Sequence, residues 1–209
     1  AGTTSVLRIW THDNFGEDLL MNVRDGGIYY WDKTNGLSTR AVNITSLVGA
    51  NKTPRVAKQV LVSDTDRHVI AFGCDPENNI GVQDPLLIRF SSQESPTTWQ
   101  SLPDNTAGDL RIGSGSEIIA AVETRQQVLV FTDVSLHAMQ FLGPPFTFGI
   151  NMLSENISIM SPLCAIAHDD AVYWMGFEEF YAYAGQVQRI PCSVRSYVFD
   201  DFNREQKEK

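Results

Sequence analysis

The sequence has few cysteines, few basic residues and no long apolar run, and each shortage argues against a class of protein. Cys74, Cys164 and Cys192 are too few and too irregularly spaced for a disulfide framework, so we expect reduced, buried thiols. Sixteen Lys and Arg against 25 Asp and Glu leave a net charge of −9, which argues against a general binder of the nucleic-acid backbone. No apolar run approaches the roughly 18 residues that span a bilayer, so we expect no membrane insertion.

Motifs for catalysis and metal binding are also scarce. His12-Asp13 and His168-Asp169-Asp170 lie beside expected turns, where Asp commonly bonds to nearby backbone, and zinc spacings such as Cys-x-x-Cys are missing. The segment Asp75–Ile80 resembles a calcium loop only superficially, because Ile80 occupies the position that needs Gly, and a surface loop is the better interpretation. The run Gly113–Ser116 does not match a nucleophile elbow. We therefore predict no enzymatic activity, no cofactor and no metal site.

Pairs of adjacent acids are the remaining catalytic candidates. In principle such pairs can assemble a glycosidase site from two carboxyl groups. Neighbouring residues on a strand point to opposite faces, however, so each pair supplies at most one inward carboxylate. We interpret them as solvated loop acids. The pairs are Glu17-Asp18, Glu178-Glu179 and Asp200-Asp201.

Short β-type runs recur between turn signals, whereas helical periodicity is scarce. Two hairpins have clear turns, with Asp25, Gly26 and Gly27 in the first and Asp169 and Asp170 in the second. An Asp-Gly step between apolar runs is a strong hairpin signal, because both residues tolerate positive φ. The expected strands are Leu19–Val23, Ile28–Trp31, Val69–Gly73, Leu86–Phe90, Ile118–Glu123, Val128–Thr132, Leu136–Phe141, Leu163–Ala167, Ala171–Met175, Phe180–Ala184 and Gln186–Ile190.

An internal repeat distinguishes among an all-β sandwich, a barrel and a propeller. Aromatic second strands end near Trp31, Phe90, Phe131 and Trp174, with separations of about 59, 41 and 43 residues. A period of about 40–50 residues with several strands per unit fits propeller blades. We predict an all-β fold, a β-propeller or a sector of one. Its approximate blades are residues 1–60, 61–113, 114–160 and 161–202, and 203–209 is a charged tail that continues into a longer chain.

Aromatic side chains are the predicted cores and packing surfaces of these blades, since each can bury about 150–250 Å². The candidates are Trp10, Tyr29, Trp31, Phe90, Phe131, Tyr173, Trp174 and Tyr181. The segment Gly143–Gly149 contains adjacent prolines, which remove donors from a β-ladder. We interpret it as a crossover between blades or a protruding loop.

Two blocks of the sequence carry a resemblance to a known family. The first reads WTHDNFGEDLL from Trp10 and GGIYYWD from Gly26, and the second includes AVYWMG, FYAY and QRIPCSV between Ala171 and Val194. Both are similar to the β-propeller tail proteins of tailed bacteriophages, the nozzle or tail-hub component that stabilises packaged DNA in short-tailed phages. The similarity runs from about Val6 to Phe202. It consists of structural residue types rather than a catalytic signature.

The resemblance implies a non-enzymatic virion protein of the phage tail, made in the cytoplasm of the bacterial host. Such proteins form a ring of identical subunits, usually a hexamer, around the DNA exit channel, bound to an adaptor or portal ring. Double-stranded DNA would then pass without tight binding. The acidic balance suits this role, because a conduit that weakly repels phosphates lets the polymer slide.

Two other functions fit the sequence. The first is a phage propeller that cleaves polysaccharide, a depolymerase or sialidase-like glycosidase, which requires inward carboxylates and a Tyr or Arg cluster at the propeller axis. The second is a cytoplasmic scaffold propeller that binds peptides on one face and remains a monomer. The sequence alone leaves both open.

Overall fold

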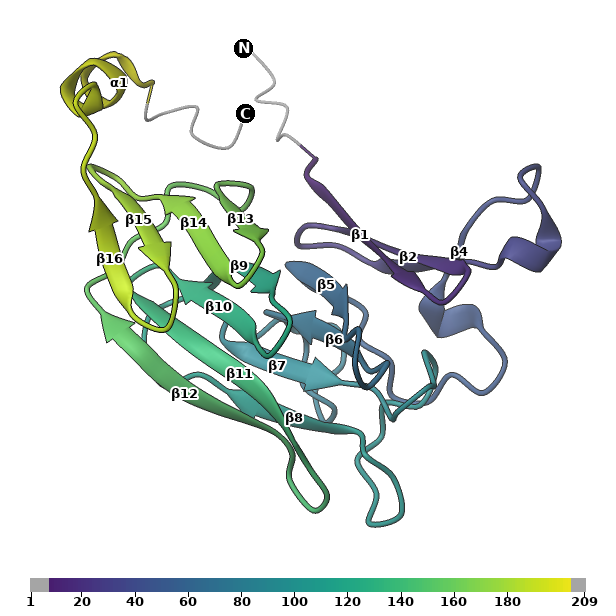
Figure 1. Cartoon of the computed structure of the whole chain (residues 1–209). Coiled ribbons are helices and arrows are strands. Elements are labelled where there is room, and N and C mark those ends of the chain that lie inside the picture. The colour runs from purple at the N-terminus through teal and green to yellow at the C-terminus, as the bar shows by residue number, and fades with distance from the viewer. Residues whose placement is uncertain (1–7, 204–209) are drawn as a thin grey trace.

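The computed structural model describes residues 8–203, and these form an all-β molecule with a propeller-like arrangement of blades (Figure 1). Each of its four antiparallel sheets uses four strands that are consecutive in the chain. Blade 1 comprises β1 (Trp10–Phe15), β2 (Asp18–Val23), β3 (Ile28–Trp31) and β4 (Val42–Asn43). Blade 2 comprises β5 (Gln59–Val62), β6 (Val69–Phe72), β7 (Leu87–Phe90) and β8 (Gly108–Arg111).

The other two blades repeat this meander. Blade 3 comprises β9 (Ile118–Glu123), β10 (Val128–Thr132), β11 (Ser135–Gly143) and β12 (Thr147–Glu155). Blade 4 comprises β13 (Ala165–His168), β14 (Ala171–Met175), β15 (Phe180–Tyr183) and β16 (Val187–Ile190). The boundary expected between residues 60 and 61 falls inside β5, because the long connection from β4 belongs to no sheet.

Within residues 8–203, helical structure is confined to three short segments. Two single-turn 3₁₀ helices, η1 (Lys33–Asn35) and η2 (Ile44–Ser46), flank β4, and each begins where an Asp or Asn side chain accepts a backbone N–H two residues ahead. The α-helix α1 (Arg195–Asp201) follows blade 4. Among the described residues, no helix is long and apolar enough to cross a membrane.

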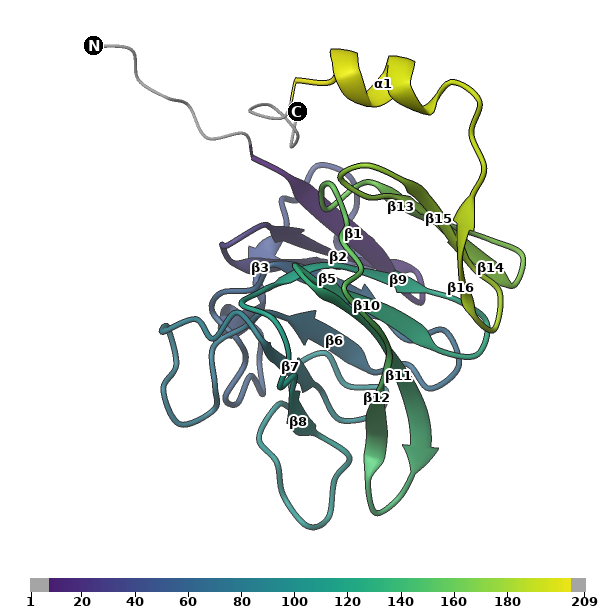
Figure 2. The ribbon, with the colours of Figure 1, turned by 90° about the vertical axis from the view of Figure 1, so that its left-hand side faces the viewer.

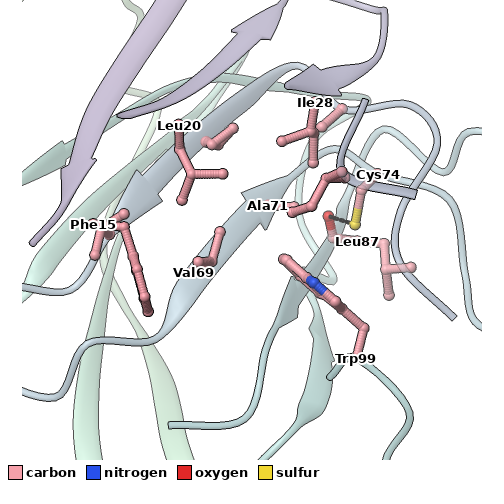
Figure 3. Packing of buried hydrophobic residues seen from close by; sticks show 12 residues of the cluster. Phe15, Leu20, Ile28, Val69, Ala71, Cys74, Leu87 and Trp99 are labelled. Atoms are coloured by element: carbon pink, nitrogen blue, oxygen red, sulfur yellow. Dashed lines mark hydrogen bonds between the residues drawn. The ribbon is translucent and has the colours of Figure 1, made fainter. Parts of the chain in front are cut away.

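The hydrophobic core consists of three clusters, one at each contact between consecutive blades. The first contains Leu20 and Ile28 of blade 1 with Val60 and Val69 of blade 2, as the close-up in Figure 3 shows in part. The strand period of two explains this arrangement, since alternate residues of one strand point to opposite neighbours. In β6, for example, Val69 and Ala71 face blade 1, whereas Ile70 and Phe72 face blade 3.

The stack of blades is open between its first and last members. The second cluster joins blades 2 and 3, and the third joins blades 3 and 4. No hydrophobic cluster of the described residues joins blade 4 to blade 1. Figures 1 and 2 show β1 and β13 on the two sides of this opening.

The predicted aromatic core residues divide into three groups. Phe90, Phe131, Trp174 and Tyr181 are buried at blade contacts, and the Phe131 and Trp174 rings meet edge to face with centroids 5.1 Å apart. Tyr29 and Trp31 are half-buried on the free face of blade 1. Trp10 and Tyr173 are 50% and 42% exposed on the free faces of the two end blades, so neither belongs to a core of the described residues.

Of the two alternatives for Gly143–Gly149, the protruding loop is confirmed and the crossover is wrong: the segment is the turn of the β11–β12 hairpin within blade 3, and Phe146 protrudes at its tip. The segment Asp75–Ile80 is a loop with Asn78 and Asn79 exposed, but its first residue, Asp75, is fully buried. Its carboxylate accepts the backbone N–H groups of Arg55, at 2.9 Å, and Gly81, at 2.6 Å, and so closes two loops.

Candidate functional site

We call the first strand of each blade (β1, β5, β9 and β13) its inner strand. The turns that follow these four strands lie at one end of the molecule, which we call the inner-turn end. It comprises residues 16–17, 63–68, 124–127 and 169–170, which join the first two strands of each blade. The Arg67 guanidinium lies 5.3 Å from the centroid of the Phe15 ring and so connects the first two turns. A hollow of about 240 Å³ connects the second, third and fourth turns, since its lining includes Asp64, Arg125 and Asp169.

Three hollows surround the β9–β10 turn, and Thr124 and Arg125 line all of them. The largest, about 550 Å³, lies between blades 3 and 4. Its wall contains a chain of hydrogen bonds: Gln140 Nε2 donates to Gln127 Oε1 at 2.9 Å, and Gln127 Nε2 donates to the Tyr183 hydroxyl at 3.1 Å. The hollow of about 310 Å³ lies between blades 2 and 3, with Phe141 and Phe148 on its apolar side.

Two carboxylates connect blade 2 to its neighbours on either side. Asp13 of β1 accepts the Val62 N–H at 2.8 Å, and Glu123 of β9 accepts the Asp64 N–H at 3.0 Å. Burial raises the pKa of Glu123 to about 7, and the negative charges of Asp64 and Asp13 add to the increase. Burial also raises the pKa of Asp13. The inner-turn end therefore holds a carboxyl group that is half-protonated near neutral pH.

Positive charge at this end is sparse and weakly held. Arg125 lies 3.9 Å from an Asp170 carboxylate oxygen, and both side chains are 73% exposed. An exposed pair of this kind contributes little stability. Glu17, Asp64, Asp169 and Asp170 are exposed at this end, against the two exposed cations Arg67 and Arg125, so its exposed side chains carry a net negative charge.

The opposite end of the inner strands is held by ion pairs and hydrogen bonds. Lys58 Nζ, on a side chain that is 8% exposed, lies 2.7 Å from Glu117 Oε2 and 3.2 Å from Asp25 Oδ1. Arg24 Nη1 donates to the Ile119 carbonyl at 3.0 Å and thereby connects blade 1 to blade 3. The predicted turn residues Asp25, Gly26 and Gly27 thus form the β2–β3 turn at a structural junction.

In the β2–β3 turn, Asp25 takes the positive φ that its sequence allows, whereas Gly26 and Gly27 do not. Asp25 has φ of 56°, and the Gly26 N–H donates to the Val23 carbonyl at 2.8 Å. In the β13–β14 turn, Asp169 has φ of 54°. Asp25 therefore forms part of a turn and also pairs with Lys58, whereas Asp169 and Asp170 line the hollows of the inner-turn end.

Between these two ends, Gln59 connects the inner strands of blades 2 and 3. Its side-chain amide donates to the Ala121 carbonyl at 2.6 Å and accepts the Ala121 N–H at 2.8 Å. An amide with one donor and one acceptor thus replaces a pair of β-ladder hydrogen bonds between sheets that do not pair directly.

Two histidines that sequence reasoning missed are buried. His68 is fully buried among Phe90, Phe141 and Phe148, and its Nε2 lies 3.0 Å from Thr106 Oγ1. Burial lowers the pKa of His68 to about 4. His137 Nε2 lies 2.9 Å from Ser135 Oγ, but Ser135 is 1% exposed, so this pair has no access to a substrate.

The other acids and histidines of interest lie apart. His12 and His168 are exposed on the two end blades. In the pair Glu17-Asp18, Asp18 accepts the Lys33 N–H at 2.9 Å and the Tyr30 hydroxyl, so it stabilises a turn rather than lying free in a loop. In the part of the chain that the structure describes, no group of three or more His, Cys, Asp or Glu side chains is arranged to hold a metal ion.

Sequence analysis also missed Asp64, Glu123 and Arg125 as members of one site. The only signal is that Glu123 ends one expected strand and Arg125 follows it closely, which is common in β proteins, and no such signal marks Asp64. All three cysteines are free, with Cys74 buried and Cys164 and Cys192 half-buried. A scan against protein-family models and a search of curated proteins give no match to this chain.

Proposed function

We propose that the chain is a structural part of a phage tail, a propeller region of a nozzle or hub protein that assembles as a ring of six copies, as is usual in the family it resembles, around the DNA exit channel. The family resemblance of the two blocks around Trp10 and Trp174 suggests this role. In it, the protein contacts its own copies and the adjoining adaptor or portal ring, and it helps to retain and deliver packaged DNA.

The acidic inner-turn end is the observation that carries the proposal. Asp64, Asp169 and Asp170 are exposed there, and the nearby Arg125 is itself exposed and loosely paired. A surface of this kind repels phosphates, with a strength that falls over about 10 Å at 0.1 M salt. We assign it to the channel side of the ring, where repulsion prevents DNA from adhering during ejection.

Immunogold electron microscopy of phage particles whose genome encodes this chain tests the proposal. An antibody raised against the purified chain should label the tail. Particles disrupted to expose internal proteins serve as the control for epitope access. If intact and disrupted particles both remain unlabelled, the chain is not a virion component and the proposal is wrong.

Glycan hydrolysis is the second candidate function, and Glu123 favours it. A carboxyl group with a pKa of about 7 suits a general acid, and Asp64 and Asp169 line the same hollow. Incubation of the chain with cell-surface polysaccharide, followed by a reducing-end assay, tests this activity. The glycosidase interpretation requires cleavage that Glu123→Gln abolishes and that Glu155→Gln, an exposed acid on β12, leaves unchanged.

A further inference from the structure

We propose that the free faces of blades 1 and 4 are blade-packing surfaces, each covered by a further four-stranded blade of the polypeptide that contains this chain. The inference rests on how the blade faces are built, and it holds whether the protein serves in a virion or elsewhere. The segment that covers each face is an antiparallel sheet in which alternate side chains are apolar.

Each contact inside the molecule is made in the same way. One face of a blade packs on the opposite face of the next blade, and the apolar residues on that face alternate with residues that point to the other neighbour. Blade 4 therefore retains the kind of face that blade 3 uses to contact blade 4. Blade 1 retains the kind of face that blade 2 uses to contact blade 1.

The free face of blade 4 carries an apolar row across three strands. Ile166, Tyr173 and Ala182 are successive cross-strand partners on β13, β14 and β15. Ile166 is 68% exposed and Tyr173 is 42% exposed, whereas Val172 and Trp174 on either side of Tyr173 are buried against blade 3. A row of this composition resembles the covered faces of the inner blades. Phe180 of β15 points to the same face and packs on Phe199 of α1, with ring centroids 5.2 Å apart, so α1 covers part of the face while Ile166 and Tyr173 stay exposed.

The free face of blade 1 has a matching composition. Met21 and Tyr29 are cross-strand partners, and the Trp10 ring lies 6.2 Å from the Tyr29 ring. Trp10 is 50% exposed. Leu20 precedes Met21 on β2 and points to the opposite face, where it is fully buried against blade 2. Both faces of β2 therefore carry apolar side chains. Strands with two apolar faces are typical of sheets that are covered on both sides.

Continuity with the existing blade contacts favours a blade over other occupants. The two free faces flank the opening of the stack between β1 and β13, so blades in that opening would contact both of them (Figure 1). A blade inserted there would complete the pattern of three internal contacts, and it would cover the aromatic side chains that the end blades expose.

Hydroxyl-radical footprinting with mass spectrometry tests the proposal on two proteins: the polypeptide translated from the complete gene, and residues 1–209 alone. In residues 1–209, Tyr173 should be oxidised well above the buried Tyr181 and Trp10 well above the buried Trp99. In the complete polypeptide, Tyr173 should fall to the level of Tyr181, and Trp10 to that of Trp99. Phe146 at the β11–β12 tip is 73% exposed and should react equally in both proteins.

A substitution at Tyr173 gives a second measurement. It distinguishes burial of Tyr173 under a further blade from a change in the chemical reactivity of its ring. Tyr173→Glu should leave the thermal midpoint of residues 1–209 unchanged and lower that of the complete polypeptide by more than about 4 °C. Phe146→Glu is the matched control and should change neither. Equal oxidation of Tyr173 in both proteins, or a gene that encodes no further β-strands, would overturn the proposal. Failure of the antibody to label the phage tail would contradict the proposed function but not this inference.

Discussion

Single polar side chains connect the blades at their inner strands. Asp13, Gln59 and Glu123 each bond to the backbone of a neighbouring blade, and Lys58 pairs with carboxylates of two other blades. Such contacts restrict how one sheet slides on the next, because each requires a particular donor opposite a particular acceptor. The same side chains determine how the stability of the protein responds to pH.

Glu123→Gln should raise the thermal midpoint at pH 8 and change it little at pH 5. The folded-state pKa of Glu123 lies near 7, above the ordinary 4.5, so the folded protein binds a proton that the unfolded chain releases in this range. Ionisation at higher pH therefore destabilises the fold by about 1–2 kcal/mol after allowance for partial solvent screening. Gln still accepts the Asp64 N–H. Thermal melts at both pH values measure the effect, with Glu155→Gln as control, and an equal shift at both values would contradict it.

His68 should make the protein less stable in acid. Its folded-state pKa lies near 4, below the ordinary 6.5, so the unfolded chain takes up a proton that the folded protein excludes. Stability should fall by up to about 3 kcal/mol as pH drops from 6.5 to 4. Urea denaturation across this range should give a shallower pH dependence for His68→Phe than for wild type. The exposed His168→Asn variant should retain the wild-type dependence, and an unchanged slope in His68→Phe would rule out the assignment.

At the scale of elements, the repeated unit is a four-stranded meander whose two faces belong to different cores. The middle strands β6, β7 and β10 of blades 2 and 3 are continuously buried. The edge strands β8 and β13 alternate between half-buried and exposed residues. The stability of a blade thus depends on its neighbours, because an isolated sheet would expose both apolar faces.

Phe131→Ala should cost about 3–5 kcal/mol of unfolding free energy, whereas Ile166→Ala should stay within about 0.5 kcal/mol. Phe131 is 1% exposed and packs edge to face on Trp174, while Ile166 lies on the free face of blade 4 and is 68% exposed. Chemical denaturation of residues 1–209 measures both variants. Similar losses would mean that the two faces of the blades are equally covered in this chain.

At the scale of the whole molecule, four blades form an open stack with an acidic inner-turn end and aromatic free faces. The net charge of −9 is spread over many positions, yet the inner-turn end collects acids from the turns of blades 1, 2 and 4. Duplex DNA should therefore not be retained by the chain at physiological salt, because retention requires clustered Lys and Arg.

A triple variant, Asp64→Lys with Asp169→Lys and Asp170→Lys, should bind duplex DNA in a salt-dependent manner that wild type lacks. The new lysines replace clustered acids beside Arg125 and create the clustered positive charge that backbone binding needs. Gel-shift titration at two salt concentrations measures the change. A control with the same charge change, Glu178→Lys with Asp200→Lys and Asp201→Lys, should gain less. Equal gains, or tight binding by wild type, would contradict the assignment of this surface to a DNA channel.

The repetition of hairpins was readable from the sequence, but several strands were not. Asp-Gly at Asp25 and the aromatic strand ends indicated the all-β fold and its blades, because turn chemistry and period-two patterns are local. The strands β1, β4, β5, β8 and β12 were not predicted. β1 contains four consecutive polar residues, Thr11–Asn14, and β12 follows two prolines, so their pairing depends on the strands beside them.

The sequence by itself determined the fold class, the turn positions and the acidic balance, since these follow from local backbone preference and composition. Only the tertiary structure decided which aromatic side chains are covered and which acids meet. Glu123 and Asp64 are 59 residues apart in the chain, and they come together because blades 2 and 3 stack with their first turns at the same end. Burial and mutual repulsion then shift the pKa of Glu123, and neither effect exists before the blades have packed.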